Sequence, residues 1–109
     1  MSNSILIKNY GLDVSDFEVS PFESLNMLHT RSALKKIIHE LTNEERIQLY
    51  SYDMLLIQNA KKMSEHIREV YDFSLSTEPS SEWWWHLDKV AKGEISFHLS
   101  TDSESNMAM

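Results

Sequence analysis

The 109-residue sequence contains no cysteine. This absence excludes a disulfide framework, a thiolate metal site and a cysteine nucleophile. No stretch approaches the roughly 18 consecutive apolar residues that a membrane span needs. The first residues also lack the basic and apolar regions of a signal peptide. By elimination, we expect a cytoplasmic protein that does not cross a membrane.

Glycine and proline are also scarce, with two of each, and neither occurs between Phe22 and Glu78. A stretch of this length without a strong helix breaker favours α-helix. The scarcity of glycine also leaves no glycine-rich loop for phosphate binding and no Gly-x-Ser-x-Gly nucleophile motif. We therefore expect an all-α fold in a single domain covering residues 1–99.

The first helix has a clear start. Ser20 stands at the N-cap position, Pro21 at the first helical position and Glu23 at the third. A serine N-cap followed three residues later by glutamate forms a capping box, and proline is tolerated at the first helical position. Apolar residues continue beyond this start, and we predict a helix over residues 21–40.

A second capping box, formed by Thr42 and Glu45, predicts a long helix over residues 42–71. About 28 helical residues span roughly 42 Å at 1.5 Å per residue. A compact globule of this chain length is roughly 34 Å across. We therefore expect an antiparallel helical hairpin that is either elongated or completed by a second copy of the chain.

The remaining segments are shorter. A third helix is predicted over residues 80–92, followed by Gly93 as the residue after its C-cap. Residues 5–7 and 95–99 could each form a short strand, so we expect irregular or short-strand arms at both termini. The polar residues 100–109 are expected to form a disordered acidic tail.

The predicted long helix carries two apolar stripes in its first half. One stripe follows its whole length and is expected to pack on the first helix. The second stripe covers only residues 47–57 and needs another cover, either from this chain or from a second copy. We therefore predict a homodimer interface centred on Ile47, Tyr50, Met54 and Ile57.

Three consecutive tryptophans follow in the predicted third helix. On a helical wheel, Trp83 and Trp84 share the apolar stripe and are expected in the core. Trp85 falls roughly opposite this stripe. Its ring is therefore expected either to contact a protein partner or to be covered by a terminal arm of the chain itself.

Catalytic and metal-binding patterns are weak. Asp53 lies in the most apolar part of the long helix, but its angle points towards the polar side, so we expect it to be solvated or paired with a base. No two of the five histidines have the spacing of a helical metal site, and we predict no metal and no cofactor. These histidines are His29, His39, His66, His86 and His98.

The net charge of −7 disfavours binding to nucleic acid, because phosphates repel an acidic protein. Our leading hypothesis is a non-enzymatic protein-interaction module, a small adaptor or regulator that forms a homodimer and binds an unidentified protein. The alternative hypothesis is an acidic inhibitor that mimics nucleic acid and blocks a basic site on a partner.

Overall fold

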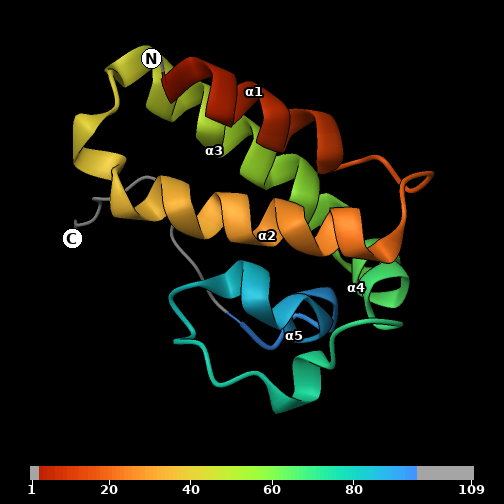
Figure 1. Cartoon of the computed structure of the whole chain (residues 1–109). Coiled ribbons are helices and arrows are strands. Elements are labelled where there is room, and N and C mark those ends of the chain that lie inside the picture. The colour runs from red at the N-terminus through yellow and green to blue at the C-terminus, as the bar shows by residue number, and fades with distance from the viewer. Residues whose placement is uncertain (1–2, 96–109) are drawn as a thin grey trace.

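The computed structural model describes residues 3–95, and all regular secondary structure in this range is helical (Figure 1). The predicted all-α class is therefore confirmed for the described part of the chain. The α-helices are α1 (Asn3–Asp13), α2 (Pro21–Lys36), α3 (Asn43–Gln58), α4 (Ala60–Ile67) and α5 (Leu87–Ala91). Three 3-10 turns accompany them: η1 (Ile38–Glu40), η2 (Phe73–Leu75) and η3 (Trp83–His86).

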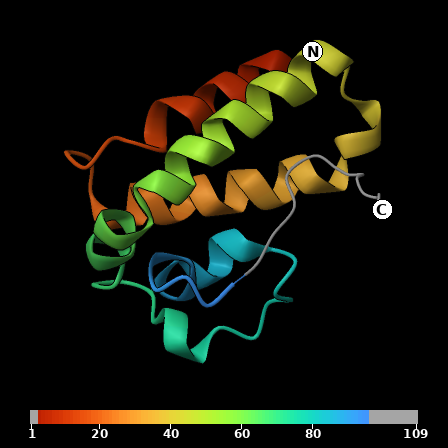
Figure 2. The same cartoon turned by 180° about the vertical axis from the view of Figure 1, so that it is seen from behind.

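The helices form two groups (Figures 1 and 2). In the first group, α1 packs on both α2 and α3, and α2 runs in the opposite direction to these two helices. In the second group, α4 packs on α5, and α4 also contacts α2. The predicted two-helix hairpin is not confirmed, because α1 packs on both of the helices that would form it.

The amino-terminal segment was expected to be irregular or a short strand, and this expectation is wrong. Residues Ile7, Tyr10 and Val14 are fully buried and lie three and four positions apart, as the inner face of a helix requires. Gly11 allows α1 to approach α3 closely, because a Cβ atom at this position would lie 2.4 Å from the ring of Tyr52. A third helix therefore completes the first group.

The predicted helix starts are confirmed. The Oγ of Ser20 accepts a hydrogen bond from the backbone N–H of Glu23 at 3.2 Å. At the start of α3, Thr42 Oγ1 accepts from the backbone N–H of Glu45 at 3.1 Å. The Glu45 carboxylate in turn accepts from the backbone N–H of Thr42 at 2.9 Å, which completes the capping box.

The predicted single helix over 42–71 is wrong, because the chain bends at Asn59 and continues as the separate helix α4. The Asn59 side chain donates a 3.4 Å hydrogen bond to the carbonyl of Val14, just beyond the end of α1. The bend also lets α4 pack on α2 and α5. The overhang expected from one long helix is therefore absent, and the radius of gyration is 13.8 Å, close to the roughly 13 Å expected for a compact domain.

The other predicted boundaries also shift. The first helix ends at Lys36, and residues 38–40 form the 3-10 turn η1. The predicted third helix, over 80–92, is reduced to η3 and the short helix α5. Gly93 follows the C-cap as predicted, with a φ of 73° that favours glycine. Residues 96–99 of the predicted strand and the tail over 100–109 lie outside the described residues.

The core lies between the two groups of helices and within the first group. From the apolar stripes of the sequence, the expected core residues are Phe22, Leu25, Leu28, Leu34, Ile38, Leu41, Leu49, Tyr52, Leu56, Met63, Ile67, Trp84 and Leu87. Most of them are buried, but Phe22 at the start of α2 is 69% exposed. Leu25, Ile38 and Tyr52 are only partly buried at the edge of the core. The largest fully buried side chains include Trp84, Tyr10, Met27, Leu28, Leu34, Leu49, Leu56, Met63, Ile67 and Leu87.

Candidate functional site

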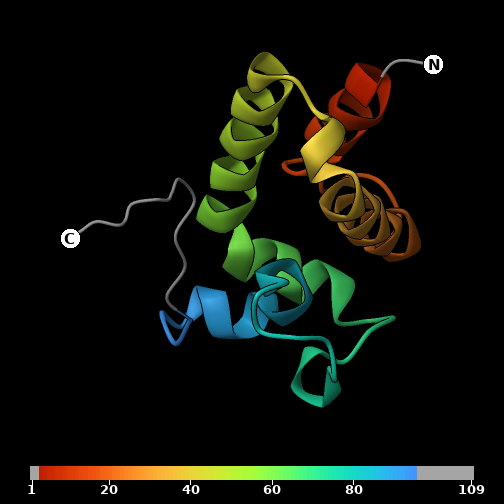
Figure 3. The ribbon, with the colours of Figure 1, turned by 90° about the vertical axis from the view of Figure 1, so that its left-hand side faces the viewer.

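The candidate site is the outer surface of α3, on the side away from α1 and α2 (Figure 3). Ile47 is 70% exposed there and Met54 is 46% exposed. Tyr50 and Ile57 lie together at one edge of this surface and are partly buried against the core. We call these four residues the α3 face. The predicted positions therefore share one side of a helix, with Ile47 and Met54 exposed and Tyr50 and Ile57 partly covered.

The α3 face is unusual because no exposed charge interrupts it. Charged residues make up 25% of the sequence, yet between Ile47 and Gln58 the only one is Asp53, which is fully buried. The other exposed large apolar residue on this part of α3 is Leu55, at 40% exposure. Interface cores are depleted in charge relative to the rest of a protein surface. This surface therefore has the composition of an interface core.

Trp85 does not belong to this surface, and the expectation that its ring would face away from the core is wrong. It is only 4% exposed, because residues of α2 and Tyr71 surround its ring. Its ring contacts those of His29 and Tyr71, with centroids at 4.9 and 5.3 Å. Its indole N–H donates to Ser32 Oγ at 2.8 Å. The chain itself therefore covers Trp85, through α2 and Tyr71.

The side of α3 that faces the core holds a buried polar network. Arg31 on α2 forms two parallel hydrogen bonds to the Asp53 carboxylate, each 2.9 Å long. The Tyr10 hydroxyl donates to the same carboxylate at 2.5 Å. Asp53 is therefore paired with a base, as one of our two alternatives stated, but its expected position on the polar side of the helix is wrong. The network joins α1, α2 and α3.

This network shifts the pKa of two of its members. Burial, together with the neighbouring Asp53 carboxylate, raises the pKa of Tyr10 well above its usual value of 10.0. Burial lowers the pKa of Arg31, but the hydrogen bonds and charge of Asp53 outweigh this effect and raise it overall. The Arg31 guanidinium also lies 4.3 Å from the ring centroid of Trp84, a favourable cation–π contact. Tyr10 therefore keeps its proton, which it donates to Asp53, and Arg31 keeps the positive charge that pairs with Asp53.

The raised pKa of Tyr10 predicts a loss of stability at alkaline pH. The folded protein keeps the Tyr10 proton after the unfolded chain has lost it, so the stabilisation is complete below about pH 10. Above that pH, the free energy of unfolding should fall by up to about 1.4 kcal/mol per pH unit through this group. Urea unfolding of the wild type and of Tyr10→Phe between pH 9 and 11 would measure it. Equal slopes in the two proteins would contradict the prediction.

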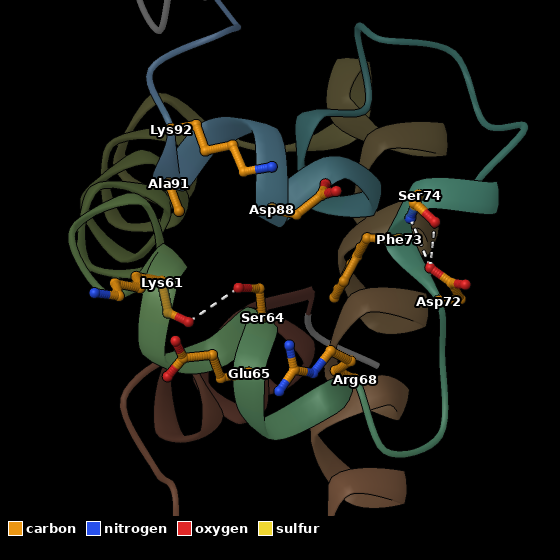
Figure 4. Close-up of a pocket in the computed structure, with 10 residues that line it drawn as sticks. All are labelled: Lys61, Ser64, Glu65, Arg68, Asp72, Phe73, Ser74, Asp88, Ala91 and Lys92. Carbon is orange, nitrogen blue, oxygen red and sulfur yellow. Dashed lines mark hydrogen bonds between the residues drawn. The ribbon is translucent and has the colours of Figure 1, made fainter.

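An open groove of about 520 Å³ lies between α4, η2 and α5 (Figure 4). Arg68, just after α4, and Lys92, just after α5, extend towards it from opposite sides, with Asp88 beside Lys92. Asp72 at its edge accepts hydrogen bonds from the backbone N–H and the hydroxyl of Ser74, which lower its pKa. Both signs of charge line the groove, so its charge selects no class of ligand.

A second groove, of about 540 Å³, lies between α2 and the segment that leads to η3. His29, Tyr71 and Trp85 contribute its aromatic side chains. Lys35 and Glu82, on its rim, neutralise each other through an ion pair of 3.1 Å. Because the aromatic rings contact one another, this groove is explained as the edge of the tryptophan cluster.

Neither a metal site nor a membrane span emerges from residues 3–95. In this range, no group of three or more histidine or acidic side chains is placed to hold a metal ion. His66 and His86 are each bonded to a backbone carbonyl, of Val19 and Glu78, and His98 lies beyond the range. No helix of the described chain is both long enough and apolar enough to cross a membrane.

Comparison with known proteins finds no matching family model, no similar curated protein and no similar solved structure.

Sequence reasoning missed the buried network, although part of its signal was present. Asp53 is the only charged residue in the apolar stretch of α3, and Arg31 is the only charged residue among the middle turns of α2. Two opposite charges in apolar surroundings suggest a buried pair. Their pairing could not be derived, because it depends on how α2 and α3 cross.

Proposed function

We propose that this chain is a non-enzymatic protein-interaction module, a small adaptor or regulator that pairs with a second copy of itself through the α3 face. The observation that carries the proposal is the part of α3 from Ile47 to Gln58, which has no exposed charge and on which Ile47 is 70% exposed and Met54 46% exposed. Removing such side chains from water is favourable, at roughly 25 cal/mol per Å² of apolar surface.

The spacing of the α3 face suits a second copy. Its residues are separated by three, four and three positions, so the pattern is symmetric about position 52. A two-fold axis at that position would place two α3 helices antiparallel. Ile47 of one copy would then meet Ile57 of the other, and Tyr50 would meet Met54. Such an interface uses the same patch on both chains, as two-fold dimers do.

The ends of α3 favour the same arrangement. Glu44 is exposed in the first turn of α3, and Lys61 is exposed at the start of α4. In the antiparallel pair, Glu44 of one copy would approach Lys61 of the other. The positive end of each helix dipole would also lie beside the negative end of its partner. The area of one helix pair is small, so we expect a weak, concentration-dependent dimer.

The alternative of an acidic inhibitor has less support from the described residues. A mimic of nucleic acid needs acids arranged along one face. On α4, the exposed acid Glu65 stands between the exposed bases Lys62 and Arg68. This part of the chain therefore presents no continuous acidic face, and the interaction module remains our proposal.

Sedimentation velocity over a range of protein concentrations tests this proposal. We expect the wild type to self-associate as concentration rises and Ile47→Glu to remain monomeric, because two buried carboxylates would face the symmetric interface. Leu75→Glu is the matched control, since Leu75 is 74% exposed but lies on η2. Undiminished self-association of Ile47→Glu would overturn the proposal. A wild type that stays monomeric at the highest concentration would overturn it as well.

A further inference from the structure

The described chain ends near the α3 face. α5 closes at Gly93, and the backbone N–H of Glu94 donates back to the carbonyl of Lys89 at 2.9 Å. α5 also contacts α3. In Figure 3, the end of α5 lies on the same side of the molecule as α3, and α1 and α2 lie on the opposite side. The chain therefore continues from the side towards which the outer surface of α3 points.

The residues that follow have a pattern suited to an apolar surface. Ile95, the last described residue, is partly buried against the core. From there, apolar and polar residues alternate in the sequence, so Ile95, Phe97 and Leu99 would share one side of an extended segment. No lysine or arginine occurs after Lys92. The four residues 96–99 can reach about 13 Å, close to the roughly 15 Å from Ile57 to Ile47 along α3.

We propose that residues 96–99 bind the α3 face of their own chain and compete there with a second copy. This inference rests on the proposed dimer and adds its regulation. Phe97 and Leu99 cover the exposed residues of the face, Ile47 and Met54, and the segment must leave before two α3 helices can pair. A segment tethered this closely acts at an effective concentration in the millimolar range. Even a weak contact therefore holds the chain as a monomer at micromolar concentrations.

Dimer affinity is the first test, made on the full chain by sedimentation velocity. Phe97→Asp releases the segment, and we expect the dimer dissociation constant to fall by about tenfold or more. His98→Asp introduces the same charge on the other side of the alternation and is the matched control, with an expected change of less than about twofold. An unchanged dissociation constant for Phe97→Asp, in a protein that dimerises, overturns the competition and leaves the proposed dimer intact.

Cross-linking is the second test and does not depend on dimerisation. Because the chain has no cysteine, the pair Met54→Cys with Leu99→Cys can be oxidised at concentrations where only monomer is present. We expect an intramolecular disulfide to form rapidly. The control pair is Leu12→Cys with Leu99→Cys, since Leu12 is 67% exposed on α1. Equal rates for the two pairs overturn the contact. A selective cross-link in a chain that never dimerises supports the contact and refutes the proposed dimer.

Discussion

Replacing Asp53 with leucine should lower the free energy of unfolding by about 3–5 kcal/mol. Asp53 is fully buried and accepts hydrogen bonds from both Arg31 and Tyr10. Arg31 is itself only 5% exposed, so the substitution leaves an uncompensated positive charge inside the protein. The Tyr10 hydroxyl loses its acceptor as well. Urea unfolding at neutral pH would measure the loss.

A second substitution separates the charge from the packing. A buried ion pair can often be replaced by apolar residues of similar size without a large loss of stability. We therefore expect Arg31→Met with Asp53→Leu to be more stable than Asp53→Leu alone. Glu65→Ala, at an exposed position on α4, should stay within about 0.5 kcal/mol of the wild type. A double variant no more stable than Asp53→Leu would show that the charge of Arg31 is not the cause.

Replacing Trp85 with alanine should lower the free energy of unfolding by about 3–5 kcal/mol, as is typical for a buried tryptophan. Trp85 is 4% exposed and contacts the rings of His29 and Tyr71. Its loss would leave a large cavity between α2 and the segment around η3. Thermal or urea unfolding followed by circular dichroism would measure the change.

This prediction distinguishes a core tryptophan from an interface anchor. An exposed anchor can be removed with little effect on the folding of its own chain. Leu75→Ala provides that comparison, because Leu75 is 74% exposed, and we expect it to change stability by less than about 0.5 kcal/mol. A loss below about 1 kcal/mol for Trp85→Ala would show that the ring contributes little to the core and would restore it as a candidate partner contact.

Substitutions at Asp53 and Trp85 test the folding of the chain, whereas a substitution at Ile47 tests its association. Asp53 and Trp85 are among the most distinctive residues of the sequence, yet both hold helices together. Their replacement should impair any function through loss of folding. Ile47 on the α3 face is different because it is 70% exposed, so its replacement can change association while the fold remains.

The α3 face could be predicted because it depends on a short-range pattern. Residues spaced three and four positions apart share one side of any helix, whatever surrounds it. Ile47 and Met54 are exposed on one side of α3, and Tyr50 and Ile57 lie partly buried at one edge of that side. That these residues bind a second copy stays a prediction. Trp85 was expected to face away from the core, because a helical wheel cannot show that α2 and Tyr71 cover its ring.

The sequence by itself determined the all-helical class, the capped starts of α2 and α3, and the glycine after α5. Each depends on groups within about four residues of one another, so the chain specifies it locally. Only the tertiary structure decided the bend at Asn59, the helical form of residues 3–13 and the burial of Asp53. Asn59 bonds to Val14, Gly11 faces Tyr52, and Asp53 meets Tyr10 and Arg31. These partners lie 22 to 45 residues apart, and they meet only after the helices have packed.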